Sequence, residues 1–159
     1  MAIDIGSRMR RAKWSRRPAD VPKALAIVRE GPDRKALETV FGELEWPLTL
    51  ANSTMCAIAL KQRSAYPVVL YERERTQCDW REAVSFLSRL SPRPYVILLS
   101  SSYDKNLWDE FVRRGGFDIL RTPVDRNSLI LAVTSGWRLW RNQQKLLEKS
   151  QAITPLRTA

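Results

Sequence analysis

One stretch, from Tyr95 to Asp125, constrains the fold of this chain more than any other. It reads YVILLSSSYDKNLWDEFVRRGGFDILRTPVD: an apolar run ending in serines, an amphipathic segment closed by two glycines, a second apolar run and a proline turn. Two short apolar runs separated by a segment of helical periodicity predict a strand, a helix and a parallel strand. Parallel sheets carry their chemistry just past the strand ends. The stretch therefore predicts an α/β sheet and the edge of that sheet where a site would lie.

The rest of the chain repeats this alternation. Apolar runs near residues 24–28, 48–51, 67–71, 95–99 and 117–120 predict five short strands, each followed by a segment with helical spacing. The chain has 159 residues, of which 44% are hydrophobic, enough for one domain with a full core. We expect a flavodoxin-like, doubly wound, five-stranded parallel sheet of order 2-1-3-4-5, with helices on both faces.

The charge is concentrated at the two ends of the chain. The net charge is +10; residues 1–20 carry six Arg or Lys against two Asp, and residues 136–159 carry five against one Glu. Residues 21–135 are nearly balanced, with sixteen basic residues against fourteen acidic ones. We expect a basic flexible arm over 1–20, a folded domain over 21–141, and a helical extension and tail over 142–159.

The composition excludes several classes of site. The chain has no histidine, which excludes a His general base, a Ser-His-Asp or Cys-His pair and His metal ligands. Cys56 and Cys78 stand alone, so they indicate neither a zinc site nor a redox motif. No apolar run approaches the ~18 residues that cross a bilayer, and no secretory signal is apparent. We expect a cytoplasmic protein with no membrane partner.

From about Lys23 to Trp137 the chain resembles the receiver domain (CheY-like) of bacterial two-component response regulators. The resemblance lies in YVILLSS as a fourth strand, in GGFDILRTPVD as a fifth strand with its proline turn, and in EAVSFLSRL, which follows Cys78-Asp79-Trp80. It implies a site in which paired acids hold Mg²⁺ beside a phosphoacceptor Asp, with a Ser or Thr, a Lys and an aromatic switch residue nearby.

This chain departs from that pattern at most positions. At the paired acids stand Arg29 and Glu30, so one acid has become a cation. Glu72 stands at the position of the acceptor Asp; a shift of one residue would place Tyr71 there. Ser100 matches the Ser/Thr position. The fixed charge of Glu72 either imitates the phosphorylated state or pairs with Arg29.

The last two positions lie on the fifth strand. Thr122 stands before Pro123 in place of the Lys, Arg121 should point to the other face, and Ile119 replaces the aromatic switch residue. Metal-assisted phosphoryl transfer needs acids, acceptor and cation together. We therefore expect a degenerate receiver, or pseudo-receiver, that is not an enzyme, is not phosphorylated, and uses neither cofactor nor metal.

The last helix is the expected contact surface. Its apolar residues continue beyond what a receiver core needs, and aromatic and Arg side chains are frequent in interfaces. The candidate interface residues are Trp137, Arg138, Trp140 and Arg141. The resemblance implies that a protein partner or a second copy binds through the fourth helix, fifth strand and fifth helix.

Two further hypotheses compete with a protein-binding pseudo-receiver. In the first, the protein is a nucleic-acid-associated regulator whose last helix and basic arm supply the affinity, although no reader fold is apparent. The arm residues concerned are Arg10, Arg11, Lys13, Trp14, Arg16 and Arg17. The second, weaker hypothesis is an atypical receiver that still accepts phosphate.

Overall fold

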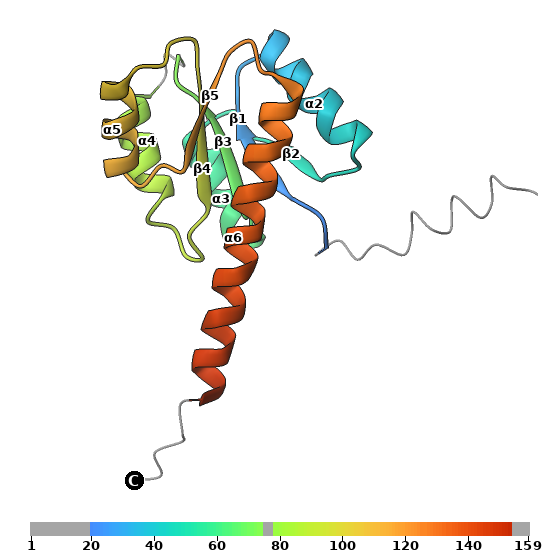
Figure 1. The fold of residues 1–159 in the computed structure, drawn as a ribbon, viewed down its shortest axis with the longest axis vertical. Helices are drawn as coiled ribbons and strands as arrows, with labels where there is room; N and C mark the ends of the chain where they lie inside the picture. The colour runs from blue at the N-terminus through green and yellow to red at the C-terminus, as the bar shows by residue number, and fades with distance from the viewer. Residues whose placement is uncertain (1–19, 75–77, 154–159) are drawn as a thin grey trace, which may run out of the picture.

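A computed structural model describes residues 20–74 and 78–153 of the chain (Figure 1). Strands and helices alternate along it. The elements are β1 (Ala24–Ile27), α2 (Pro32–Glu43), β2 (Leu48–Leu50), α3 (Thr54–Arg63), β3 (Val68–Glu72), α4 (Trp80–Leu87), β4 (Tyr95–Ser100), α5 (Lys105–Arg113), β5 (Asp118–Arg121) and α6 (Arg126–Ile153).

The strands form one parallel sheet of order β2-β1-β3-β4-β5. This confirms the predicted architecture, including the position of the short strand β2 as an outermost strand of the sheet. The register aligns Ile27 with Tyr71 and Glu72 with Leu99, and it places Ser100 beside Arg121. The carboxyl ends of β1, β3, β4 and β5 therefore meet at one edge of the sheet.

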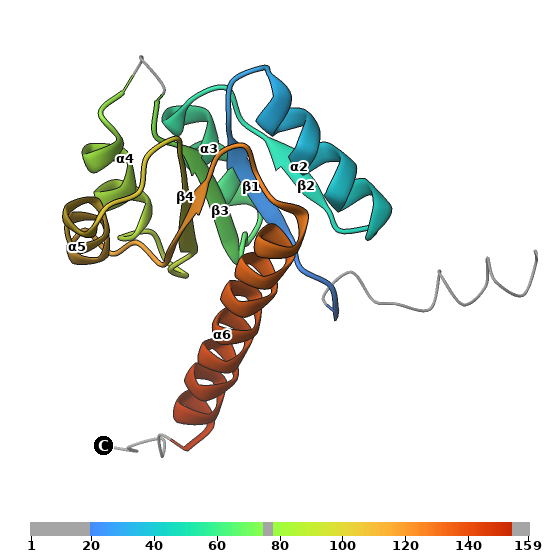
Figure 2. The same cartoon turned by 45° about the horizontal axis from the view of Figure 1, so that its top comes forward.

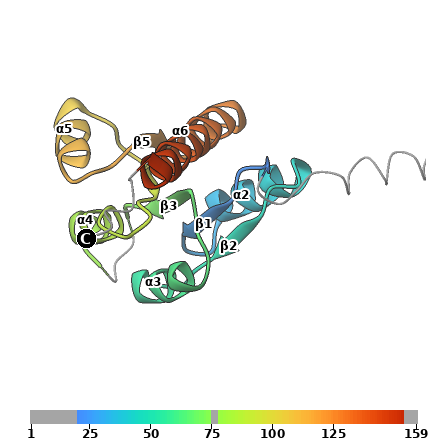
Figure 3. The same cartoon turned by 90° about the horizontal axis from the view of Figure 1, so that it is seen from below.

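Two layers of helices cover the sheet. On one face, side chains of α3, α4 and α5 pack with Leu25, Val69 and Leu98. On the other face, α2 and α6 pack on Ala26, Leu70 and others. Figure 3, which views the fold from below, separates α2 and α6 from α3 and α4. Central strands are buried on both faces, as expected of a parallel sheet, and this explains why their sequences are continuously apolar.

Local sequence signals set the ends of several helices. The Asp104 carboxylate accepts a hydrogen bond from Leu107 N at 2.8 Å, and the Asp125 carboxylate accepts one from Ser128 N at 2.9 Å. Both are N-cap contacts. Gly115 follows α5 with φ +94°, and a Cβ there would lie 2.7 Å from Ser88 Cβ. Glycine is required at this position both for its backbone conformation and for the approach of α4.

Helix α6 extends well beyond the sheet (Figures 1 and 2). It has 28 residues, and its first half packs on the sheet so closely that a Cβ at Gly136 would lie 3.2 Å from Val68 Cγ2. Beyond Trp140 its side chains are mostly exposed, including Leu146 and Leu147. Within residues 20–74 and 78–153, no helix has the length and apolar character needed to cross a membrane.

Candidate functional site

The edge formed by the strand carboxyl ends brings together most of the predicted site residues. Arg29 follows β1, Glu72 ends β3, Ser100 ends β4 and Thr122 follows β5. Thr122 N donates a hydrogen bond to Ser100 O at 2.9 Å, which joins the carboxyl ends of β4 and β5. Glu30 does not join this group: its side chain is 92% exposed and lies 3.9 Å from Arg34 Nη1.

The centre of the site is the carboxylate of Glu72. Its side chain is only 6% exposed, although most of the Arg29 side chain lies in solvent. Arg29 Nε forms an ion pair with Glu72 Oε1, while the backbone N of Arg29 donates to Glu72 Oε2 at 3.1 Å. A buried carboxylate is stable only when it is neutralised and hydrogen-bonded. Arg29 does both, and it thereby holds the ends of β1 and β3 together.

A second cation, which the sequence analysis did not single out, lies beside Ser100. Arg73 Nη1 donates to Ser102 Oγ at 2.7 Å and to Ser100 Oγ at 3.3 Å. The guanidinium carbon of Arg73 also lies 6.0 Å from the ring centroid of Trp80. The fully buried Ser100 hydroxyl in turn donates to Ser102 O at 2.7 Å. The serine hydroxyl is thus committed to contacts within this chain.

Glu74, another residue that sequence reasoning missed, anchors the same loop. It accepts hydrogen bonds from Ser101 N at 2.8 Å and from Ser101 Oγ at 2.7 Å. Partial burial raises the pKa of the Glu74 carboxyl, but the bonds from Ser101, a backbone hydrogen bond of Glu74 itself and the charge of Arg73 together outweigh this effect, so the pKa is lowered from its ordinary value. The signal for both residues was their position directly after Glu72 in the most charged loop of the domain.

The residues at this edge do not fit the Mg²⁺ that the receiver fold implies. Arg29 replaces one oxygen ligand with a cation, and Glu30 lies in solvent. Both carboxylate oxygens of Glu72 are bound by Arg29. Among the residues that the structure describes, no group of three or more Cys, Asp or Glu side chains is placed to hold a metal ion. A hard divalent cation needs several oxygen ligands at once.

The fifth strand keeps the turn of the receiver pattern without its functional side chains. The Thr122–Pro123 peptide bond is cis. Arg121 pairs with Ser100 through the β4–β5 ladder, and its side chain is exposed. Ile119 is buried in the core that faces α4 and α5. An apolar side chain held there has no polar group to report on Ser100.

The predicted interface residues divide between the domain body and solvent. Trp137 packs against the core under α2 and α6, and the guanidinium of Arg141 lies 4.9 Å from its ring centroid. Trp140 is half-buried, whereas Arg138 is exposed. A role for these residues in binding a partner stays a prediction. The arm residues predicted to contact nucleic acid lie outside the described part of the chain.

No family model and no curated protein matches the chain. Solved structures do match it. The signal receiver domain of an HD domain-containing protein from Pseudomonas fluorescens Pf-5 has a TM-score of 0.70 at 19% identity, over 79% of this chain and 93% of that one. A putative response regulator from Chloroflexus aurantiacus J-10-fl has a TM-score of 0.67 at 13% identity, over 74% and 98%.

The chemotaxis protein CheY4 from Vibrio cholerae gives a similar result, with a TM-score of 0.66 at 15% identity over 72% of this chain and 98% of that one. At such low identity these matches establish the fold. The chain has the flavodoxin-like fold of response regulator receiver domains.

Proposed function

We propose that this protein is a pseudo-receiver: a non-catalytic module of bacterial two-component-type signal transduction or transcriptional regulation that acts by protein–protein contact. Aspartate phosphorylation plays no part in its action. The observation that carries the proposal is the contact of Arg29 with Glu72, the residue at the acceptor position.

Phosphoryl transfer to a carboxylate requires an accessible oxygen, a metal that neutralises the incoming phosphate, and a cation that stabilises the product. The Glu72 carboxylate is buried and both of its oxygens accept contacts from Arg29. Arg73, a cation that contacts Ser100, donates hydrogen bonds to Ser100 and Ser102. The carboxylate at the acceptor position, the serine and the cation beside it are therefore already bonded within the chain.

Of the two interpretations of Glu72, the geometry favours the ion pair. A group that imitates a phosphoryl would bond the Ser100 hydroxyl, but that hydroxyl instead contacts Arg73 and Ser102. Pairing with Arg29 ties β3 to the segment after β1 in one arrangement. On this proposal, the site is a permanent structural lock and the domain signals from one conformation.

The test is incubation with Mg²⁺ and acetyl phosphate, followed by intact-mass measurement. We expect the wild-type mass to stay unchanged. The triple variant Arg29→Asp/Glu72→Asp/Thr122→Lys restores an acid, the acceptor and the cation, so it is the matched positive control. A phosphoryl group on the wild type that disappears in Glu72→Gln would overturn the proposal.

The contact surface of the proposal is the outer half of α6. Leu139, Leu146 and Leu147 are exposed there, and Leu146 is 64% exposed. Leu139 and Leu146 are seven residues apart, so they lie close to one line along the helix. Light scattering or co-purification should show a protein partner, or a second copy, that Leu146→Glu releases and the exposed-site control Lys149→Glu retains. Equal behaviour of the two variants contradicts this surface.

A further inference from the structure

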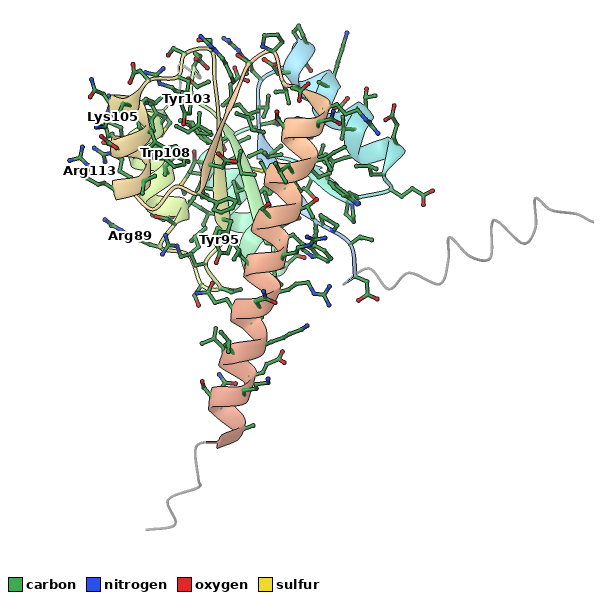
Figure 4. All side chains as sticks on the ribbon, viewed as in Figure 1. Arg89, Tyr95, Tyr103, Lys105, Trp108 and Arg113 are labelled. Carbon is green, nitrogen blue, oxygen red and sulfur yellow. The ribbon has the colours of Figure 1, made fainter. Side chains whose placement is uncertain are left out.

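A groove rich in arginine lies at the opposite edge of the sheet from Glu72. It has a volume of about 590 Å³ and lies between the carboxyl-terminal ends of α4 and α5. Four arginines and two serines supply most of its lining, with no acidic residue among the lining residues: Arg89, Arg93, Arg113, Arg114, Ser85 and Ser88. In Figure 4, Arg89 and Arg113 extend from the same side of the molecule, where α4 and α5 lie.

The positive charge of this groove is poorly compensated. The acid that contacts it is Glu110, which lies 3.4 Å from Arg114 Nη2. Glu110 also binds Arg81, and this hydrogen bond is the main reason that the pKa of its carboxyl is lowered. One carboxylate is thus shared by two guanidinium groups. Arg114 Nε is buried and has no hydrogen-bond acceptor among the described residues.

Stabilisation of helix ends accounts for only part of this cluster. Arg93 Nη2 donates to Gly115 O at 3.2 Å, and Arg113 Nε donates to Asp109 O at 3.2 Å. Such contacts with carbonyls near the carboxyl end of a helix are common. However, a guanidinium has five N–H donors, so each of these residues keeps several free. The Arg89 side chain makes no hydrogen bond or ion pair with any residue that the structure describes.

We propose that this groove binds a small ligand that carries at least two phosphate groups. The planar guanidinium matches phosphate oxygens with paired N–H donors. The volume lies within the range of about 300–1,000 Å³ that is typical of small-molecule sites. The arginines line one concavity instead of following an extended track, which favours a small ligand over a polymer. No aromatic side chain lines the groove, so the phosphates themselves are the recognised group.

Calorimetry with inorganic pyrophosphate at constant ionic strength tests the proposal on the full chain. We expect Arg89→Gln and Arg113→Gln each to weaken binding on the order of tenfold, because each removes charged hydrogen bonds to the ligand. Both residues are exposed, so the fold should persist. The control Lys35→Gln removes the same charge from an exposed position on α2 and should bind as the wild type does.

Two further probes separate the alternatives. Monophosphate should bind more weakly than pyrophosphate if two phosphate groups are engaged, and equal affinities contradict that part of the proposal. Failure of the wild type to bind pyrophosphate, or an equal loss in Lys35→Gln, overturns the site. Binding of an oligoglutamate peptide or a short oligonucleotide in preference to pyrophosphate also overturns it, because the groove would then serve a macromolecule. None of these outcomes bears on phosphorylation of Glu72.

Discussion

The arginines at the two edges of the sheet differ in how far their charge is compensated by neighbouring side chains. At the edge formed by the strand carboxyl ends, Arg29 neutralises the buried Glu72 and Arg73 is held by two serines. At the opposite edge, four arginines line an open groove in which Glu110 is the contacting acid. The first edge is where receiver domains carry out their chemistry, yet here it is closed by its own side chains.

This difference shows that the charge of the groove arises from where the arginines lie in the fold and not from an excess of basic residues in the domain. Residues 21–135 have sixteen basic and fourteen acidic side chains. Such a balance would give most basic side chains an acidic partner, as Arg29 has in Glu72. Three arginines without a carboxylate partner among the described residues, Arg89, Arg93 and Arg113, are instead gathered where α4 and α5 end. Uncompensated charge that is concentrated in a concavity favours an anionic ligand.

The largest expected effect is at the closed edge. Arg29→Ala should lower the free energy of unfolding by about 2 kcal/mol, because it leaves a buried carboxylate without its cation. Urea denaturation measures this change. The control is Arg126→Ala, which breaks an exposed ion pair with Glu43 and should cost less than about 1 kcal/mol. Equal losses in the two variants would show that the ion pair of Arg29 with Glu72 contributes no more to stability than an exposed ion pair does.

Arg73→Ala should have a smaller effect at the same edge, about 1 kcal/mol, since two hydrogen bonds to serine hydroxyls are lost. The Ser100 hydroxyl keeps its bond to Ser102 O, so no buried group is left without a partner. Thermal unfolding beside the exposed-site variant Arg121→Ala provides the comparison. If Arg73→Ala is no more destabilising than Arg121→Ala, the serines do not hold this cation.

Arg89→Gln should change stability by no more than about 0.5 kcal/mol, because the side chain makes no contact with the described residues that folding would lose. Thermal unfolding at low and high salt checks the result. We expect any change to shrink at high salt, where repulsion among the groove arginines is screened. A loss as large as that of Arg29→Ala would show that the open edge is also a structural cluster.

The smallest effect concerns Asp118, at the start of β5. Burial raises the pKa of its carboxyl above the ordinary 3.8, although a backbone hydrogen bond from Ile119 opposes the shift. The folded protein therefore holds this proton more tightly than the unfolded chain, and stability is lost as the pH rises from 3.8 through the raised pKa. The side chain is only half-buried, so solvent screening limits this loss to about a few tenths of a kcal/mol.

Asp118→Asn removes the ionisable group, so the variant should be slightly more stable than the wild type at neutral pH. The difference should vanish at pH values below the ordinary pKa of Asp. Paired thermal melts across this range measure it. If the variant is less stable than the wild type at neutral pH, the charged Asp118 carboxylate is stabilised by a cation. Charge would then be compensated at this edge as well.

The fold could be predicted from the sequence because its signals are local. Apolar runs such as YVILLSS and the helical spacing around Phe111 do not depend on distant residues, and parallel strands have few allowed orders. The resemblance to receivers also located Glu72, Ser100 and Thr122 at one edge, where the structure brings them together.

The contacts of the site could be predicted only in part. The pairing of Arg29 with Glu72 was foreseen as one of two interpretations, because opposite charges followed neighbouring strands. The role of Arg73 was not, since a residue after a strand can point to either side of the sheet edge. The groove was missed for a similar reason. Its arginines come from the last residue of α5 and from the segments that follow α4 and α5, and only the packing of α4 beside α5 places them together.

Helix α6 has a geometric consequence for any partner that binds its outer turns. The helix is continuous over 28 residues, so it is about 42 Å long, and close packing at Gly136 fixes it on the sheet. Each residue advances the helix by about 100°, which fixes the angular phase of a bound partner relative to the domain. Insertion of four residues after Asn142 would return the partner close to its original phase. Insertion of two residues would turn the partner to the opposite side of the helix axis. The number of residues in α6 therefore sets the side of the domain on which a bound partner lies.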